Sequence, residues 1–162
     1  VTGGGATLAL DADELRLVAR NDIVVRERDS VTVESISTTA GGRVDFRAGG
    51  SADTTTVLGS VRTIAGHDVS IVTDSGALRL EQAITALAFG AARGGDITIR
   101  GAAGLELGAE ADLTSEGGNI TLSAGTGSLV MTAETYVRAG TGLLDVSAEG
   151  NDKFPLVAAK TY

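Results

Sequence analysis

The chain has 162 residues, with 23 Gly, one Pro and no Cys, so disulfide frameworks, thiolate zinc sites and cysteine nucleophiles are excluded. Its formal charge of −8 at pH 7 and its aromatic content of 3% argue against a nucleic-acid-binding surface. No apolar run approaches the roughly 20 residues of a membrane helix, so we expect neither a nucleic-acid partner nor membrane insertion. The chain opens at Val1 without an initiator Met or a leader, as expected of a processed product or an excised piece.

One sequence motif repeats along the chain, in some copies clearly and in others in a diverged form. After a short copy at Leu8 and Leu10, its copies are DIVVR (22–26), GGRVDFRAGG (41–50), GHDVSIVTDSGALRL (66–80), GGDITIRGAAGLEL (94–107), GGNITLSAGTGSLVM (117–131) and GLLDVSA (142–148). The first inward apolar residue of each unit recurs with a mean spacing of about 24 residues. These residues are Ile23, Val44, Val69, Ile97, Ile120 and Leu144.

Each unit contains two runs in which apolar and small polar residues alternate, followed by a weaker third run. In the copy that starts at Gly94, the apolar positions are Ile97/Ile99, Leu105/Leu107 and Leu113. A unit of three short strands cannot bury one apolar face alone, but stacked units bury a continuous column. We therefore predict an all-β fold, a single right-handed parallel β-helix (β-solenoid) over residues 1–150. It should have about six rungs of about 24 residues and three short strands per rung.

Two stretches depart from this cadence. Residues 81–93, EQAITALAFGAAR, have helix-like spacing at Ile84, Leu87 and Ala88, and we interpret them as a third strand with a bulged loop or one short helical turn. Residues 151–162, NDKFPLVAAKTY, contain the single Pro and both Lys residues of the chain. This segment is interpreted as an exit segment towards a following domain or as a C-terminal cap over the last rung.

The stretch GGDITIRGAAGLELGAEADLTSEGGNITLSAGTGSLVMTAETYVRAGTG resembles the repeat region of filamentous-haemagglutinin-type large bacterial exoproteins. The shared motif is a G-G-[DN]-[IV]-x-[IL] cadence, and the resemblance extends from about Gly41 to Gly150. It implies a right-handed parallel β-helix in a secreted or cell-surface stalk, hence an extracellular or bacterial cell-surface location. The implied partners are neighbouring repeats or domains of a larger chain, a glycan or protein on a host or cell surface, or further copies of the chain.

A parallel β-helix can also carry a polysaccharide-active enzyme, whose chemistry needs carboxylates clustered across neighbouring rungs. The expected outward positions of the first strand are Ala9, Val24, Asp45, Ser70, Thr98, Thr121 and Asp145. Those of the second strand include Arg16, Thr32, Arg79, Glu106 and Val130. Asp45 and Asp145 would lie four rungs apart, roughly 19 Å, which is too far to cooperate. Arg79 over Glu106 is most simply a cross-strand ion pair.

Polar residues also mark the corner before the first strand, at Asp22, Asp68, Asp96 and Asn119. Stacked carboxylates there could bind calcium, but Asp and Asn also accept hydrogen bonds from turn backbone, and we favour that role. The neighbouring His67 is interpreted as a solvated turn residue and Met131 as a core gap-filler. Ser70, Thr98 and Thr121 should form a short outward hydroxyl file, which their β-propensity explains.

From these patterns we predict no catalytic residue, no cofactor site and no metal ligand, and hence not an enzyme. The expected function is a non-catalytic structural or adhesive stalk segment of a large secreted or cell-surface bacterial protein. A self-assembling extracellular filament or sheath subunit is the alternative. A β-helix polysaccharide-active enzyme or glycan-binding module is the weaker hypothesis.

Overall fold

The computed structural model describes residues 7–89, 93–132 and 135–149, and these residues form strands and turns without a helix. Seven parallel strands form a first sheet in the order β1 (Thr7–Leu10), β3 (Ile23–Glu27), β5 (Val44–Ala48), β7 (Val69–Thr73), β10 (Ile97–Arg100), β13 (Ile120–Ser123) and β16 (Leu144–Ser147). The second sheet contains β2 (Glu14–Ala19), β4 (Thr32–Thr38), β6 (Thr55–Thr63), β8 (Ala77–Leu80), β9 (Ile84–Ala86), β11 (Leu105–Leu107), β12 (Leu113–Ser115), β14 (Leu129–Met131) and β15 (Val137–Arg138).

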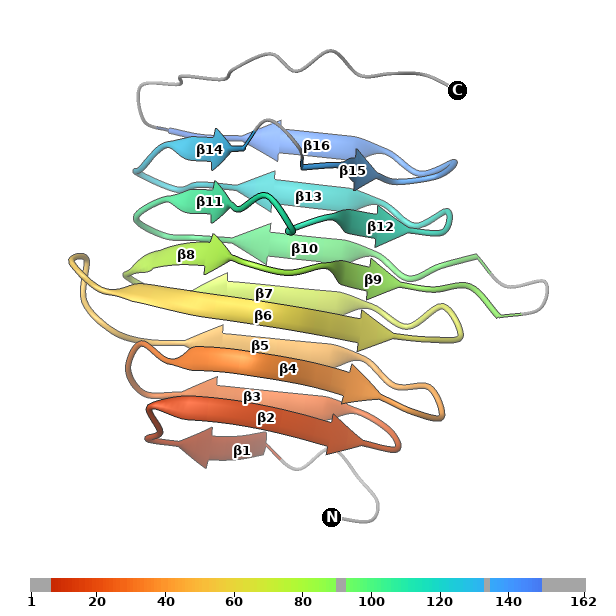
Figure 1. Ribbon diagram of the computed structural model, residues 1–162, viewed down its shortest axis with the longest axis horizontal. Helices are drawn as coiled ribbons and strands as arrows, with labels where there is room; N and C mark the ends of the chain where they lie inside the picture. The colour runs from red at the N-terminus through yellow and green to blue at the C-terminus, as the bar shows by residue number, and fades with distance from the viewer. Residues whose placement is uncertain (1–6, 90–92, 133–134, 150–162) are drawn as a thin grey trace.

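The two sheets are the two sides of one coil that rises from the N-terminal to the C-terminal end (Figure 1). In Figure 1 the nearer strands run to the right and the farther strands run to the left as the chain rises, so the coil is right-handed. It makes about five full turns with a spacing of roughly 24 residues, close to the predicted six. The prediction of an all-β parallel solenoid is therefore confirmed.

The predicted register is confirmed in the first sheet. Ile97 lies beside Val69 on one side and Ile120 on the other, and Ile120 lies beside Leu144. The remaining predicted inward residues continue the same column through Val44 and Ile23. A second inward column consists of Leu8, Val25, Phe46, Ile71, Ile99, Leu122 and Val146. Most members of both columns are almost fully buried, and burying such a side chain contributes about 1.5–3 kcal/mol each.

The second sheet differs between the two halves of the coil. After β7 each turn has three short strands, as predicted, because a bend interrupts the second side between β8 and β9 and again between β11 and β12. Before β7 the prediction of three strands per rung is wrong, since β2, β4 and β6 each run along the whole second side. Strand β6 pairs with β8 through one end and with β9 through the other.

Glycine permits this long strand to pass close to its neighbour. A Cβ atom at Gly59, in the middle of β6, would lie 2.1 Å from the carbonyl oxygen of Glu34 in β4. The prediction for residues 81–93 is resolved in favour of the strand, since Ile84–Ala86 form β9 between Val61 and Leu113 of the adjacent turns. The predicted exit or cap segment, 151–162, lies outside the described residues.

The repeated Gly-Gly pairs have a packing reason at the corner that leads into the first sheet. A Cβ atom at Gly118 would lie 2.3 Å from the carbonyl oxygen of Gly95, one turn below. A Cβ atom at Gly95 would likewise lie 2.1 Å from the carbonyl oxygen of His67. The second glycine of each pair is therefore required because the backbone of the preceding turn occupies the place of a side chain.

Candidate functional site

The corner before the first sheet forms a ladder of hydrogen bonds that joins successive turns. The side-chain Oδ1 atom of Asp68 accepts from the backbone N–H of Asp96 at 2.8 Å, and Oδ1 of Asp96 accepts from the N–H of Asn119 at 2.8 Å. The Oδ1 atom of Asn119 accepts from the N–H of Leu143 at 2.9 Å. Each side chain thus satisfies the backbone of the turn above it, which is the structural role that the sequence favoured.

The same kind of side-chain to backbone hydrogen bond occurs earlier in the coil and at one further corner. Oδ1 of Asp22 accepts from the backbone N–H of Arg43 at 3.0 Å. A further corner of this kind, not predicted from the sequence, lies just before β12. There Oδ1 of Asp112 accepts from the N–H of Tyr136 at 2.9 Å. Asp112 precedes Leu113 as Asp96 precedes Ile97, so the repeat contained the signal. Among the described residues no group of three or more His, Asp or Glu side chains could hold a metal ion.

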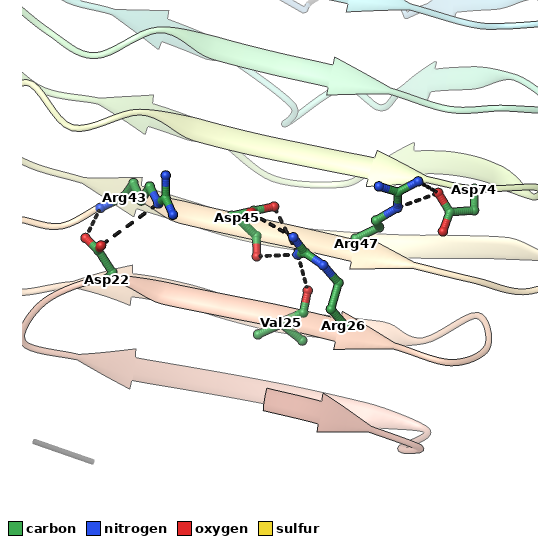
Figure 2. Close-up of polar contacts among 7 residues, drawn as sticks. All are labelled: Asp22, Val25, Arg26, Arg43, Asp45, Arg47 and Asp74. Atoms are coloured by element: carbon green, nitrogen blue, oxygen red, sulfur yellow. Dashed lines mark hydrogen bonds and ion pairs between the residues drawn. The ribbon is translucent and has the colours of Figure 1, made fainter. Parts of the chain in front are cut away.

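Arginine and aspartate side chains cover the outer face of the first sheet near β3 and β5 (Figure 2). The Arg26 guanidinium donates to both carboxylate oxygens of Asp45, at 3.1 and 2.9 Å, and to the carbonyl oxygen of Val25 at 2.9 Å. Asp45 was the candidate outward carboxylate of this sheet. It is held in a bidentate ion pair with its neighbour one turn below.

A second pair links β5 to the turn above it. The Nε atom of Arg47 donates to Oδ1 of Asp74 at 2.6 Å (Figure 2). This hydrogen bond, together with the negative charge of Asp74, raises the pKa of the Arg47 guanidinium above its ordinary value. The Nε atom of Arg43 lies 3.9 Å from Oδ2 of Asp22 on the same face. The alternation of the strands did not reveal these pairs, because their partners do not lie directly beside one another on adjacent strands.

The predicted Arg79–Glu106 pair is present on the second sheet, with 3.8 Å between the Nε and Oε1 atoms. A shorter contact of 3.0 Å joins the same Nε atom to Oε1 of Glu81. The side chains are about half exposed, so each pair contributes little to stability. Beside them lies a shallow hollow of about 200 Å³, lined by Thr55, Ala77, Leu78, Arg79, Ala103, Gly104, Leu105, Glu106, Ser128 and Val130.

The predicted hydroxyl file is confirmed in register, since Thr98 lies beside Ser70 and Thr121. Asp145 lies beside Thr121 and continues the column, four steps from Asp45, as predicted. Roughly 4.8 Å per step separates the two carboxylates by roughly 19 Å. The acid and base of a glycosidase would need to be much closer than this.

Two expected members of the outward columns lie elsewhere. Ala9 was wrongly placed beside Val24, whose neighbour is Thr7, and instead lies beside Arg26. Arg16 was wrongly placed over Thr32, whose neighbour is Glu14; it lies beside Ser35, because a bulge between Leu15 and Arg16 shifts the register by one residue past Glu34. The extra residue also interrupts the alternation of β4, where the buried Val33 and Ile36 are three positions apart.

The two remaining residues weighed from the sequence have structural surroundings. His67 is exposed at a corner, and its carbonyl oxygen accepts from the hydroxyl of Thr63 at 2.7 Å. Met131 lies beside Leu107 and packs, partly buried, against the core. Neither residue lies in a cluster of polar side chains that would suggest catalysis.

One buried carboxylate was not anticipated. Glu27 is 5% exposed, and its Oε1 atom accepts from the backbone N–H groups of Arg28 at 2.9 Å and Ala12 at 3.3 Å. Its Oε2 atom is buried without a hydrogen-bond partner. The alternation of Ile23, Val25 and Glu27 along β3 already placed this residue on the inward side, so the sequence contained the signal.

Comparisons with protein-family models, with curated proteins and with solved structures find no match to this chain. In the described part of the chain, no helix has the length and apolar character needed to span a membrane. The fold therefore defines the class of protein, a parallel β-solenoid, and its polar side chains chiefly hold successive turns together.

Proposed function

We propose that this chain is a rigid, non-catalytic stalk segment of a large secreted or cell-surface bacterial protein. The cadence that resembles filamentous-haemagglutinin-type exoproteins supports this proposal, as does the solenoid fold, which suits a rod that separates two attachment points. Its extracellular location and its attachment to neighbouring repeats belong to the same proposal. A glycan or protein on a facing cell surface is the proposed adhesive partner.

The observation that carries the proposal is the continuity of the links between turns. Apolar columns, parallel backbone ladders and corner bonds such as Asp96 to Asn119 each cross from one turn to the next. Since apolar columns and backbone ladders join the turns throughout the coil and corner bonds reinforce several of these joins, the rod should resist bending and stretching. The carboxylates that could serve in catalysis are either far apart, as are Asp45 and Asp145, or engaged in ion pairs.

Distances between spin labels test the rigidity directly. Ala9, Arg100 and Ser147 lie in one outward column of the first sheet, with Ala9 four steps from Arg100 and six from Ser147. Because the chain has no Cys, labels at Ala9→Cys with Arg100→Cys or with Ser147→Cys report on these positions alone. A rigid rod should give narrow distributions whose backbone separations are roughly 19 and 29 Å. Broad or overlapping distributions would contradict a rigid spacer.

Two functional assays complete the test. Beads carrying the chain should adhere to cell surfaces or to arrayed surface glycans, and Ile120→Asp, which disrupts the rod, should abolish this adhesion. Assays on pectin-like and alginate-like polymers should show no turnover. Turnover that disappears in Asp45→Asn or Glu106→Gln would replace the stalk by a polysaccharide-active enzyme.

A filament or sheath subunit is the second candidate. It is favoured by the apolar residues exposed at the C-terminal end of the coil, Leu143 at 76%, Leu144 at 49% and Val146 at 39%. End-to-end stacking of copies would bury them in an open, head-to-tail assembly. Negative-stain images of the purified chain distinguish the two functions, because a stalk segment gives single short rods and a subunit gives filaments.

A further inference from the structure

One outward column of the second sheet brings four polar residues together in its C-terminal part. Strands β9, β12 and β15 lie one above another on this side of the coil, above one end of β6 (Figure 1). Their paired outward residues are Arg62, Thr85, Thr114 and Arg138. Three strand spacings set the Cα atoms of the two arginines roughly 14 Å apart. The column therefore presents two threonine hydroxyls between two guanidinium groups.

The two arginines of this column have no carboxylate partner. Both are exposed, and neither belongs to an ion pair in the part of the chain that the structure describes. The residues paired with them on the neighbouring strands are all Ser or Thr, which are neutral. On the first sheet, by contrast, Arg26 and Arg47 each donate to an aspartate. An unpaired guanidinium keeps its whole fork of donors for a carboxylate from outside the chain.

An aromatic side chain lies on the same face, two residues before Arg138. Tyr136 is 70% exposed and points outward together with Arg138, because Val137 between them packs against the core. Its backbone N–H donates to Oδ1 of Asp112 at 2.9 Å, and its carbonyl oxygen accepts from the N–H of Leu113 at 2.8 Å. The ring is therefore carried by backbone that is already ordered, which lowers the entropy lost on binding. Its apolar face and its hydroxyl suit an amphipathic ligand.

We propose that this face binds an extended polysaccharide of uronic acids and is the adhesive surface of the stalk. A sugar ring stacks on Tyr136, and carboxylates of the polysaccharide accept hydrogen bonds from Arg62 and Arg138. The hydroxyls of Thr85 and Thr114, between the arginines, exchange hydrogen bonds with the hydroxyl groups of the sugars. This inference rests on the function proposed above, since it names the ligand class and the surface of that adhesion.

The low density of positive charge favours carboxylated sugars over densely sulfated ones. Two guanidinium groups lie on the described part of this column, and the whole chain has a formal charge of −8, which repels a polymer of high charge density. A planar guanidinium also matches the two oxygens of a carboxylate in a bidentate pair. In a uronic acid chain the charges alternate with less polar ring faces, which are the part that an exposed tyrosine covers.

Calorimetry with defined oligomers tests the ligand class. Oligogalacturonate and oligomannuronate, each long enough to span the column, are compared with a neutral malto-oligosaccharide, a heparin oligosaccharide and oligoglutamate. We expect the full chain to bind one or both oligouronates without cleaving them, and to bind each of the other three probes about tenfold more weakly. The two oligouronates differ in the geometry of their sugars, so their comparison identifies the preferred uronic acid.

Substitutions test the surface. Tyr136→Ala keeps both backbone hydrogen bonds of the residue and should weaken oligouronate binding about tenfold, as should Arg62→Gln and Arg138→Gln. Tyr136→Phe keeps the ring and should retain the binding. The matched control is Arg100→Gln, since Arg100 is an exposed arginine of the first sheet with no ion pair among the described residues. This control should bind as the unmodified chain does. Circular dichroism verifies the fold of each variant.

Failure of this inference can be distinguished from failure of the stalk function. Equal binding of heparin or oligoglutamate, or an equal loss in Arg100→Gln, would reduce the interaction to non-specific charge and overturn the site. Oligouronate binding that survives all the substitutions would overturn the assigned surface. Absence of oligouronate binding, with beads that still adhere to cells, would overturn the ligand class and leave the adhesive stalk. Binding that depends on Tyr136 without adhesion of the beads would support the site and overturn the adhesive function.

Discussion

The two halves of the coil share two kinds of polar link between turns but differ in which kind prevails. In the N-terminal turns, residues 7–63, arginines pair with carboxylates across neighbouring strands, as Arg26 does with Asp45. In the C-terminal turns, residues 69–147, side-chain oxygens at the corners accept from the backbone of the next turn, as Asp96 and Asn119 do. The second side also changes, from single long strands to pairs of short strands.

This difference shows that one register can be held by two kinds of polar contact. Salt screens the two charges of an ion pair on a sheet face, and holding the arginine in one conformation costs side-chain entropy. Both effects weaken the pair. A corner bond joins one short side chain to backbone that the turn has already ordered. The corner bond needs a short side-chain acceptor at the same place in each turn, and Asp68, Asp96 and Asn119 supply it.

The largest loss of stability is expected in the apolar column that contains Ile120, in the C-terminal turns. Ile120→Asp would bury an unpaired charge between Ile97 and Leu144 and should lower the free energy of unfolding by several kcal/mol. The neighbouring Thr121→Lys points its charge to solvent and should cost at most about 1 kcal/mol. Thermal unfolding measures both variants. A tolerated Ile120→Asp with an unfolded Thr121→Lys would mean that inward and outward faces are exchanged.

A smaller effect is expected at the buried carboxylate of the N-terminal turns. Glu27→Ala removes the acceptor for the N–H groups of Ala12 and Arg28 and should cost about 1–3 kcal/mol. Glu27→Gln keeps an acceptor oxygen and removes the buried charge, so its free energy of unfolding should exceed that of the Ala variant. Denaturant titrations compare the three proteins. Equal stability of the Ala and Gln variants would show that the two hydrogen bonds accepted by the Glu27 side chain do not stabilise the fold.

The corner ladder of the C-terminal turns should contribute about 1 kcal/mol at each step. Asp96→Ala leaves the N–H of Asn119 without its side-chain acceptor, whereas Asp96→Asn keeps an acceptor oxygen at the same place. Amide hydrogen exchange should show faster exchange at Asn119 in the Ala variant only. Unchanged exchange in that variant would show that the hydrogen bond does not contribute to holding the turns together.

The smallest effect, and the sharpest contrast between the halves, concerns salt. A double-mutant cycle with Arg26→Gln and Asp45→Asn should give a coupling free energy of about 0.2–1 kcal/mol. This coupling should shrink at about 1 M salt, where the Debye length falls to about 3 Å. The loss of stability in Asn119→Ala, which removes a neutral hydrogen bond, should stay unchanged by salt. A coupling at Arg26 that salt does not alter would remove the distinction between the two kinds of link.

The sequence by itself determined the fold class, the spacing of the turns and most of the register. Ile97, Ile120 and Leu144 could be aligned from the repeated phrase because alternation has a period of two and the turns have nearly equal length. The corner role of Asp96 and Asn119 also followed, since both precede a strand at the same place in the repeat. These features are local, and the repeat presents them several times.

Only the tertiary structure decided which outward side chains meet when the partners belong to different columns. The bulge at Leu15 set Arg16 beside Ser35 rather than Glu34. The pairs of Arg26 with Asp45 and Arg47 with Asp74 join residues 19 and 27 positions apart. Outward side chains are long and each can reach several neighbours on the turns above and below, so alternation constrains their direction but not their partner. Backbone proximity likewise decided which glycines were required, because it depends on how closely one turn lies on the next.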